Sequence, residues 1–142
     1  MKKIKGLLKI VLCVMLCFVF ASCNLLKEEV SLWESATYTE NQTFGEGEKN
    51  FTLEVKAEER SVEFVVRTNA DILADALTEH NIIAGDEGPY GIYVTQVNGM
   101  KADYEENQSF WSLEKDGIQL TTGASETGIK DGDKFTFAYT IV

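Results

Sequence analysis

The sequence predicts an α+β domain in which a single helix covers one face of a mostly antiparallel sheet. Three observations indicate this fold class. Several runs place an apolar side chain at every second position, one segment spaces its apolar residues as a helix does, and two-residue turn signals separate the later runs. Residues 24–142 suffice for one domain with a sizeable core and not for two.

The first elements are a strand hairpin and the helix. Residues 51–55 and 62–66 alternate apolar with polar side chains, and the polar stretch KAEER between them indicates a hairpin connection. The period changes in residues 68–81, where apolar side chains recur at helical spacing, with Thr68 or Asn69 as the N-cap. The helix supplies the second layer that a lone sheet would lack.

The remaining elements are strands. The turn signals Asn98-Gly99 and Asp116-Gly117 predict two tight hairpins. A hairpin, a helix and then further strands is the order of a β-grasp, which is the arrangement that we predict for residues 50–142. The expected strands cover residues 91–97, 109–115, 118–122 and 134–142, the last after the turn KDGD.

The N-terminus has the features of a bacterial lipoprotein signal. Four lysines precede a continuous apolar run that is shorter than the roughly 20 residues of a membrane span. The run ends in FASC, which resembles the sequence cut by lipoprotein signal peptidase, so residues 1–22 are expected to be removed and Cys23 to carry the lipid anchor. The expected location is extracytoplasmic, on a bacterial membrane. An ordinary secretory signal and an uncleaved anchor are the alternatives.

Cysteine and charge counts exclude two classes of site. Cys13 and Cys17 lie within the signal and acylation consumes Cys23, so the mature chain has no disulfide and no thiolate metal site. Removal of the four signal lysines leaves 9 basic against 23 acidic residues, a net charge of −14. Binding to a phosphate backbone needs clustered Lys and Arg, which this sequence lacks, so nucleic acid is excluded as a partner.

Residues 23–49 form the expected tether between the lipid anchor and the domain. The stretch is polar, has no sustained period and runs into the breaker GEGEKN. Its aromatic residues, Trp33, Tyr38 and Phe44, are unusual in a disordered linker. The alternative for residues 35–44 is an edge strand or a segment packed on the domain.

A series of turn and aromatic motifs runs through residues 51–142, in the order Tyr90-Gly91, Asn98-Gly99, Phe110-Trp111, Asp116-Gly117, Gly123 and Asp131-Gly132-Asp133. This series resembles the C-terminal β-domain of the transcobalamin and intrinsic-factor family. It resembles even more closely the bacterial surface lipoproteins that carry a transcobalamin-like C-terminal domain. The stretch TNADILADAL also fits the family's helix, and the resemblance implies a β-grasp-like sheet with one helix.

The resemblance implies a non-catalytic binding module. In the vitamin carriers the β-domain closes over a corrinoid held against a separate helical domain, so the resemblance implies a corrinoid-like ligand, captured for uptake at the cell surface. A transporter or another surface protein is the further partner that this function implies. Residues near the matching motifs form the candidate ligand site: Tyr90, Phe110, Gly123, Ala124 and Ser125.

The neighbouring residues Phe110 and Trp111 indicate which face of their strand belongs to the ligand site. Successive side chains of a strand point to opposite faces, so Trp111 and Leu113 are expected in the core and Phe110 on the polar face. There the Phe110 ring is either one half of a cross-strand aromatic pair or a flat platform for a planar ligand.

The residues do not predict an enzyme. The chain has one histidine, no free thiol after cleavage, and no recognisable nucleophile motif or phosphate-binding glycine loop. Two hypotheses remain open. The first is a ligand-binding lipoprotein marked by outward aromatic rings. The second is a surface module that binds a protein or wall polymer through a sheet edge or loops.

Overall fold

A computed structural model describes residues 29–142 of the chain. Leu32–Val142 form one compact unit, and the hydrophobic core found within residues 29–142 lies entirely in it. The predicted signal peptide, residues 1–22, and the predicted lipidation site, Cys23, lie outside the described residues. From residue 29 onward, no helix has the length and apolar character that crossing a membrane requires.

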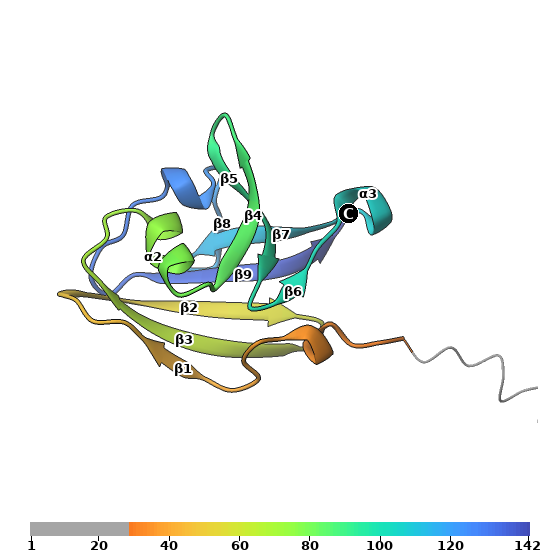
Figure 1. The fold of residues 1–142 in the computed structure, drawn as a ribbon, viewed down its shortest axis with the longest axis horizontal. Helices are drawn as coiled ribbons and strands as arrows, with labels where there is room; N and C mark the ends of the chain where they lie inside the picture. The colour runs from red at the N-terminus through yellow and green to blue at the C-terminus, as the bar shows by residue number, and fades with distance from the viewer. Residues whose placement is uncertain (1–28) are drawn as a thin grey trace, which may run out of the picture. The chain divides into compact units, whose positions relative to one another are not determined.

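Strands dominate the described residues, and short helices interrupt them (Figure 1). In chain order the elements are η1 (Leu32–Ser35), β1 (Gln42–Phe44), β2 (Lys49–Ala57), β3 (Arg60–Thr68), α2 (Leu73–Glu79), β4 (Ile83–Gly88), β5 (Gly91–Val97), β6 (Met100–Lys101), α3 (Tyr104–Asn107), β7 (Ser109–Lys115), β8 (Ile118–Gln119), η2 (Ala124–Glu126) and β9 (Lys134–Ile141). The elements written η are 3₁₀ helices.

The strands form two sheets. The larger has six strands in the order β1-β3-β2-β9-β7-β8, and the smaller has three in the order β4-β5-β6. In the larger sheet β1 is parallel to β3 and β2 is parallel to β9, whereas the other neighbours are antiparallel. The α+β class predicted from the sequence is confirmed. Within residues 29–142, however, the molecule has two sheets and a second short helix, where one sheet and a single helix were predicted.

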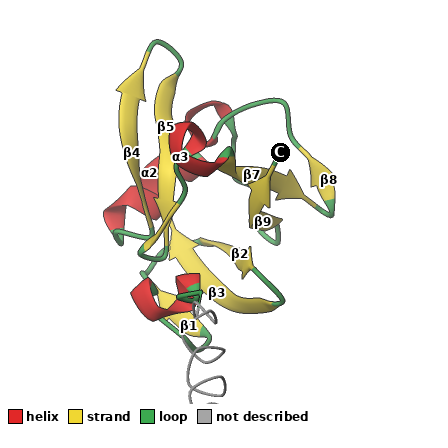
Figure 2. Ribbon diagram, turned by 90° about the vertical axis from the view of Figure 1, so that its right-hand side faces the viewer, coloured by secondary structure: helices red, strands yellow, loops and turns green. Residues whose placement is uncertain are grey.

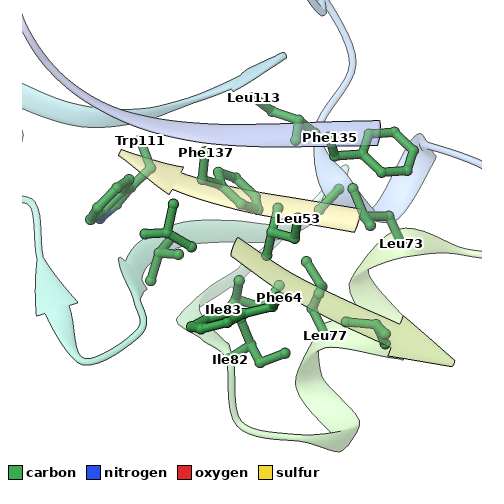
Figure 3. Close-up of a cluster of buried hydrophobic side chains, with 14 of the residues drawn as sticks. Leu53, Phe64, Leu73, Leu77, Ile82, Ile83, Trp111, Leu113, Phe135 and Phe137 are labelled. Carbon is green, nitrogen blue, oxygen red and sulfur yellow. The ribbon is translucent and has the colours of Figure 1, made fainter. Parts of the chain in front are cut away.

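One face of the larger sheet is covered by α2 and by the smaller sheet, which lie on the same side of it (Figures 1 and 2). The core fills this interface. Alternate residues of β2 and β3 are buried, and Leu73 and Leu77 of α2 belong to the same cluster as Leu53 and Phe64 of the sheet (Figure 3). Full burial of a side chain of this size stabilises the fold by about 1.5–3 kcal/mol.

Helix α2 begins later than the sequence indicates, and a distant loop satisfies its first turn. The N–H of Leu73, its first residue, donates to Thr127 O at 2.9 Å, and no side chain caps the helix. Neither predicted cap residue serves there. Thr68 ends β3, and Asn69 Oδ1 accepts from the N–H of Glu48 at 2.9 Å.

The chain packs on the domain well before β2. Trp33, in η1, is 5% exposed, and its Nε1–H donates to Ala57 O at 3.0 Å. The guanidinium carbon of Arg60 lies 4.7 Å from the centre of the Trp33 ring, within the range of a cation–π interaction. η1 is therefore fixed to the end of the β2–β3 hairpin by packing, by a hydrogen bond and by a charged group over the ring.

The predicted boundary between tether and domain differs from the observed one. The compact unit starts at Leu32, and the boundary expected at residue 50 falls inside β2. Strand β1 pairs with β3 at the edge of the larger sheet, which is the alternative that the sequence offered for residues 35–44. The part of residues 23–49 from Leu32 onward thus belongs to the domain, because its aromatic side chains find partners there.

Asn98 joins this N-terminal segment to the smaller sheet. It lies in the turn between β5 and β6 with a φ of 52°, and it is 1% exposed. Its Oδ1 accepts from the N–H of Tyr38 at 2.9 Å and its Nδ2–H donates to Tyr38 O at 2.8 Å, across 60 residues of sequence. The main-chain oxygen of Asn98 also accepts from the N–H of Thr37 at 2.8 Å. The turn predicted from Asn98-Gly99 is confirmed, and the same asparagine holds a second segment.

An ion pair near the start of α2 leads to a pH-dependent prediction. Lys49 Nζ lies 2.6 Å from Asp71 Oδ1, and this hydrogen bond, together with the lysine charge, lowers the pKa of the Asp71 carboxyl. A lowered pKa stabilises the fold above the ordinary carboxyl pKa, and the contribution disappears as the pH falls through the lowered value. We predict that Lys49→Met returns the Asp71 pKa toward its ordinary value in a carboxyl NMR titration. Lys56→Met, on the same strand, should leave it unchanged, and an unaltered Asp71 titration in Lys49→Met would contradict the pair.

Candidate functional site

A groove runs between β5 and β7, and its inner part reaches the core. This inner part has a volume of about 250 Å³ and is lined by Trp111, Leu113 and Phe137, which Figure 3 shows within the core cluster. Trp111 is 7% exposed, as the alternation along the strand predicts. Ile92 and Val94 of β5 line the same part, so its lining is largely apolar.

The groove follows an open edge of β5. Strand β6 pairs with β5 only at Gln96 and Val97, which leaves the rest of that edge without a neighbouring strand. The N–H of Ile92 points away from β4, because it donates to Ser125 Oγ at 3.0 Å. The loop around Ser125 therefore holds this edge of β5 beside the apolar lining of the inner groove.

The outer part of the groove, about 660 Å³, lies over the exposed face of the smaller sheet. Asp86 and Tyr93 are direct cross-strand partners on this face, so their side chains lie side by side. Helix α3 contributes Tyr104 and Glu105, and Asp103 caps it by accepting from the N–H of Glu105 at 3.0 Å. Tyr93 and Tyr104 are 57% and 53% exposed, so two aromatic rings are available to a ligand.

The loop around Gly123 is fixed from both sides. Thr127 Oγ1–H donates to Gly123 O at 2.8 Å, and the Ser125 hydroxyl accepts from the start of β5. Gly91 makes this contact possible, since it has a φ of +96° and a Cβ there would lie 2.2 Å from the Cβ of Ser125. The loop and the β4–β5 hairpin are thus held together where the groove ends.

The structure brings three of the five predicted ligand residues to the groove. Phe110 is half-buried and lines both parts, and Gly123 and Ala124 line the inner part. Tyr90 is 80% exposed and lies outside the groove lining, because the pairing of β4 with β5 places it at the hairpin tip. Ser125 acts through its hydrogen bond to β5 and does not line the groove.

Sequence reasoning missed the two exposed tyrosines. Tyr93 lies in an alternating strand whose faces are both partly apolar, so its exposure could not be read from the pattern. Tyr104 lies in a helix of four residues, too short for an apolar period. One signal was present, because Asp103 followed three residues later by Glu106 is the pattern of a capped helix start.

Comparison with known proteins identifies the family. Residues 70–140 match the family described as a domain of unknown function, DUF4430. The chain belongs to this family. The DUF4430 region extends from just before α2 into β9 and includes all residues that line the groove. No curated protein sequence matches the chain.

Two solved structures are similar to this DUF4430 protein. A candidate metal-binding protein from Ruminococcus gnavus ATCC 29149 is 31% identical, with a TM-score of 0.64, and the match covers 67% of this chain and 99% of that one. Haptocorrin in complex with Cbi (cobinamide) is 19% identical, with a TM-score of 0.50, and the match covers 66% of this chain and 25% of that one. At this identity the second likeness shows the fold alone. The DUF4430 domain has a transcobalamin-like fold and spans about a quarter of haptocorrin.

The description of the Ruminococcus gnavus protein raises the question of a metal centre in this DUF4430 chain. Within residues 29–142, no three His, Cys, Asp or Glu side chains gather in a group able to hold a metal ion. The groove, with its apolar inner part and its exposed rings, is the candidate functional site.

Proposed function

We propose that this protein is a non-catalytic, lipid-anchored binding protein of the bacterial cell surface. Its groove holds a small ligand with an apolar or planar body, and a corrinoid is the candidate that we name, captured for uptake and passed to a transporter or surface partner. The observation that carries the proposal is the combination of an apolar inner groove with two exposed tyrosine rings at its outer part.

Two further observations support this function. The fold is similar to that of haptocorrin, whose structure contains Cbi. The order of the larger sheet also supports the β-grasp interpretation, since the hairpin β2–β3 is followed by α2 and the last strand lies parallel beside β2. The domain matches only a quarter of haptocorrin, so a partner protein covering the open side of the ligand is part of the proposal.

Replacing Tyr104 tests the groove. Tyr104→Ala is expected to weaken cobinamide binding about tenfold, because loss of an aromatic face against an apolar ligand removes about 1.5 kcal/mol. Tyr90→Ala is the matched control. Both rings are exposed, but only Tyr104 lines the groove, so Tyr90→Ala should leave the dissociation constant unchanged. Isothermal titration calorimetry of residues 29–142 with cobinamide measures both constants.

Gly123→Leu serves as a blocking variant in the same titration. Gly123 lines the inner part with an ordinary φ of −78°, and a Cβ there meets no atom within 4 Å, so the leucine occupies open space without backbone strain. Binding should be lost while thermal unfolding stays unchanged. No heat from the unmodified protein with cobinamide or cobalamin at millimolar concentration would contradict the proposal. That outcome would favour the surface module, for which exposed Tyr90 and Ile118 at two hairpin ends are the contact candidates.

A further inference from the structure

We propose that the ligand of this groove carries a positive charge, which lies in the outer part against the Asp86 carboxylate and the ring of Tyr93. The inference rests on the proposed function and deepens it by naming the ligand's charge and where that charge is held. The ligand class is a cation with an apolar body, whose charge lies in the outer part and whose apolar body lies in the inner part.

The first step is the relative position of Asp86 and Tyr93. They are opposite residues in the antiparallel pair β4–β5. Because the N–H of Ile92 points away from β4, its neighbour Tyr93 points its N–H and C=O toward β4 and forms the hydrogen-bonded pair with Asp86. Side chains of such a pair leave the sheet on the same face with their Cβ atoms about 5.5 Å apart. A carboxylate and an aromatic face are thereby held side by side, which is the arrangement that favours a cation.

The second step is the charge around the outer part. Three carboxylates, those of Asp86, Asp103 and Glu105, line it together with one ammonium, that of Lys101, for a net charge of −2. Asp103 is engaged in capping α3, which leaves Asp86 and Glu105 for a ligand. The side-chain ion pairs found within residues 29–142 lie elsewhere, namely Lys49–Asp71 and Lys115–Asp133. The groove therefore attracts cations and disfavours anions.

The third step is the position of the two rings. Tyr93 comes from β5 and Tyr104 from α3, and both line the outer part with more than half of the residue exposed. A tyrosine face attracts a cation within about 6 Å, and the attraction grows as both partners lose water. The apolar inner part continues from the same two tyrosines toward Trp111, so it receives the uncharged part of the ligand.

Choline and 3,3-dimethylbutan-1-ol test the charge directly, because they have nearly the same shape and differ in the quaternary nitrogen. In ¹⁵N NMR titrations of residues 29–142, choline is expected to shift the amides of Asp86, Tyr93 and Tyr104. It should bind about fivefold more tightly than the alcohol. Asp86→Asn should weaken choline binding about fivefold, and Lys101→Gln should tighten it about twofold. Both positions are exposed, so neither change disturbs the core.

The direction of these changes in choline affinity tests the inference. Equal binding of choline and the alcohol, or an Asp86→Asn variant that binds choline as the unmodified protein does, would overturn it while leaving groove binding intact. Absence of choline-induced shifts at the outer groove would overturn it as well. Failure of the proposed function is a separate result, in which the unmodified protein does not bind cobinamide. Glu106→Gln is the control, because it removes an exposed carboxylate of α3 that lies outside the groove lining. It is expected to leave the dissociation constants for choline and cobinamide unchanged.

Discussion

Trp33→Ala is expected to lower the free energy of unfolding by about 4 kcal/mol. The ring is 5% exposed, so its removal leaves a cavity that the surrounding side chains fill only in part. The carbonyl of Ala57, a residue that is 1% exposed, also loses the indole N–H as its partner. Arg60 loses the ring beneath its guanidinium.

Urea unfolding of residues 29–142, followed by circular dichroism, measures this loss without relying on tryptophan fluorescence. Trp33→Phe is the matched control. It keeps most of the packing and the aromatic face but lacks the donor to Ala57, so about 1.5 kcal/mol of destabilisation is expected. A Trp33→Ala variant within 0.5 kcal/mol of the unmodified protein would show that η1 behaves as part of a tether.

Asn98→Ala is expected to destabilise the domain by about 3 kcal/mol. The change removes two hydrogen bonds and leaves the N–H and C=O of Tyr38 without their partner in a partly buried place, which costs about 2 kcal/mol. It also places an alanine at a φ of 52°, a left-handed conformation that costs a residue with a Cβ about 1 kcal/mol.

Asn98→Gly separates the two terms. Glycine adopts the positive φ without strain, so only the loss of the two hydrogen bonds remains and about 2 kcal/mol is expected. Hydrogen exchange adds a local readout. In both variants the amide of Tyr38 should exchange much faster than in the unmodified protein. Equal stability of Asn98→Gly and the unmodified protein would mean that the bonds to Tyr38 contribute nothing.

The elements that could be predicted are those determined by residues close together in the sequence. The turns at Asn98-Gly99 and Asp116-Gly117 have positive φ at both positions, as this type of hairpin requires, and the alternation of β2 and β3 matches their burial. Trp111 was placed in the core by the same local reasoning. In each case a short-range steric or solvation rule determines the outcome.

The elements that could not be predicted depend on contacts between distant residues. Strand β4 contains two glycines and two acidic residues and is exposed after Ile83, so it lacks the apolar alternation of a strand and exists because β5 pairs with it. The start of α2 depends on the carbonyl of Thr127, more than fifty residues away in the chain. No local pattern encodes these partners.

The candidate site shows the same division. Phe110, Gly123 and Ala124 line the groove. They could be predicted because each belongs to a local motif in β7 or in the loop that follows β8. Tyr90 was included for its place next to Gly91 in sequence, yet the tight turn of the β4–β5 hairpin carries it away from the groove. Tyr93, three residues later, lies across the strand pair from an acidic side chain, a relation that only the strand register reveals.

The parallel pairing of β2 with β9 has a consequence for how the chain completes its folding. Thr52 pairs with Lys134, so a strand made early has one of its two neighbours more than eighty residues later in the chain. During synthesis the β2–β3 hairpin can close early, but the other edge of β2 stays unpaired until β9 leaves the ribosome. A nascent chain halted before residue 134 therefore exposes a strand edge open to wrong partners, and this domain assembles only once β9 has been made.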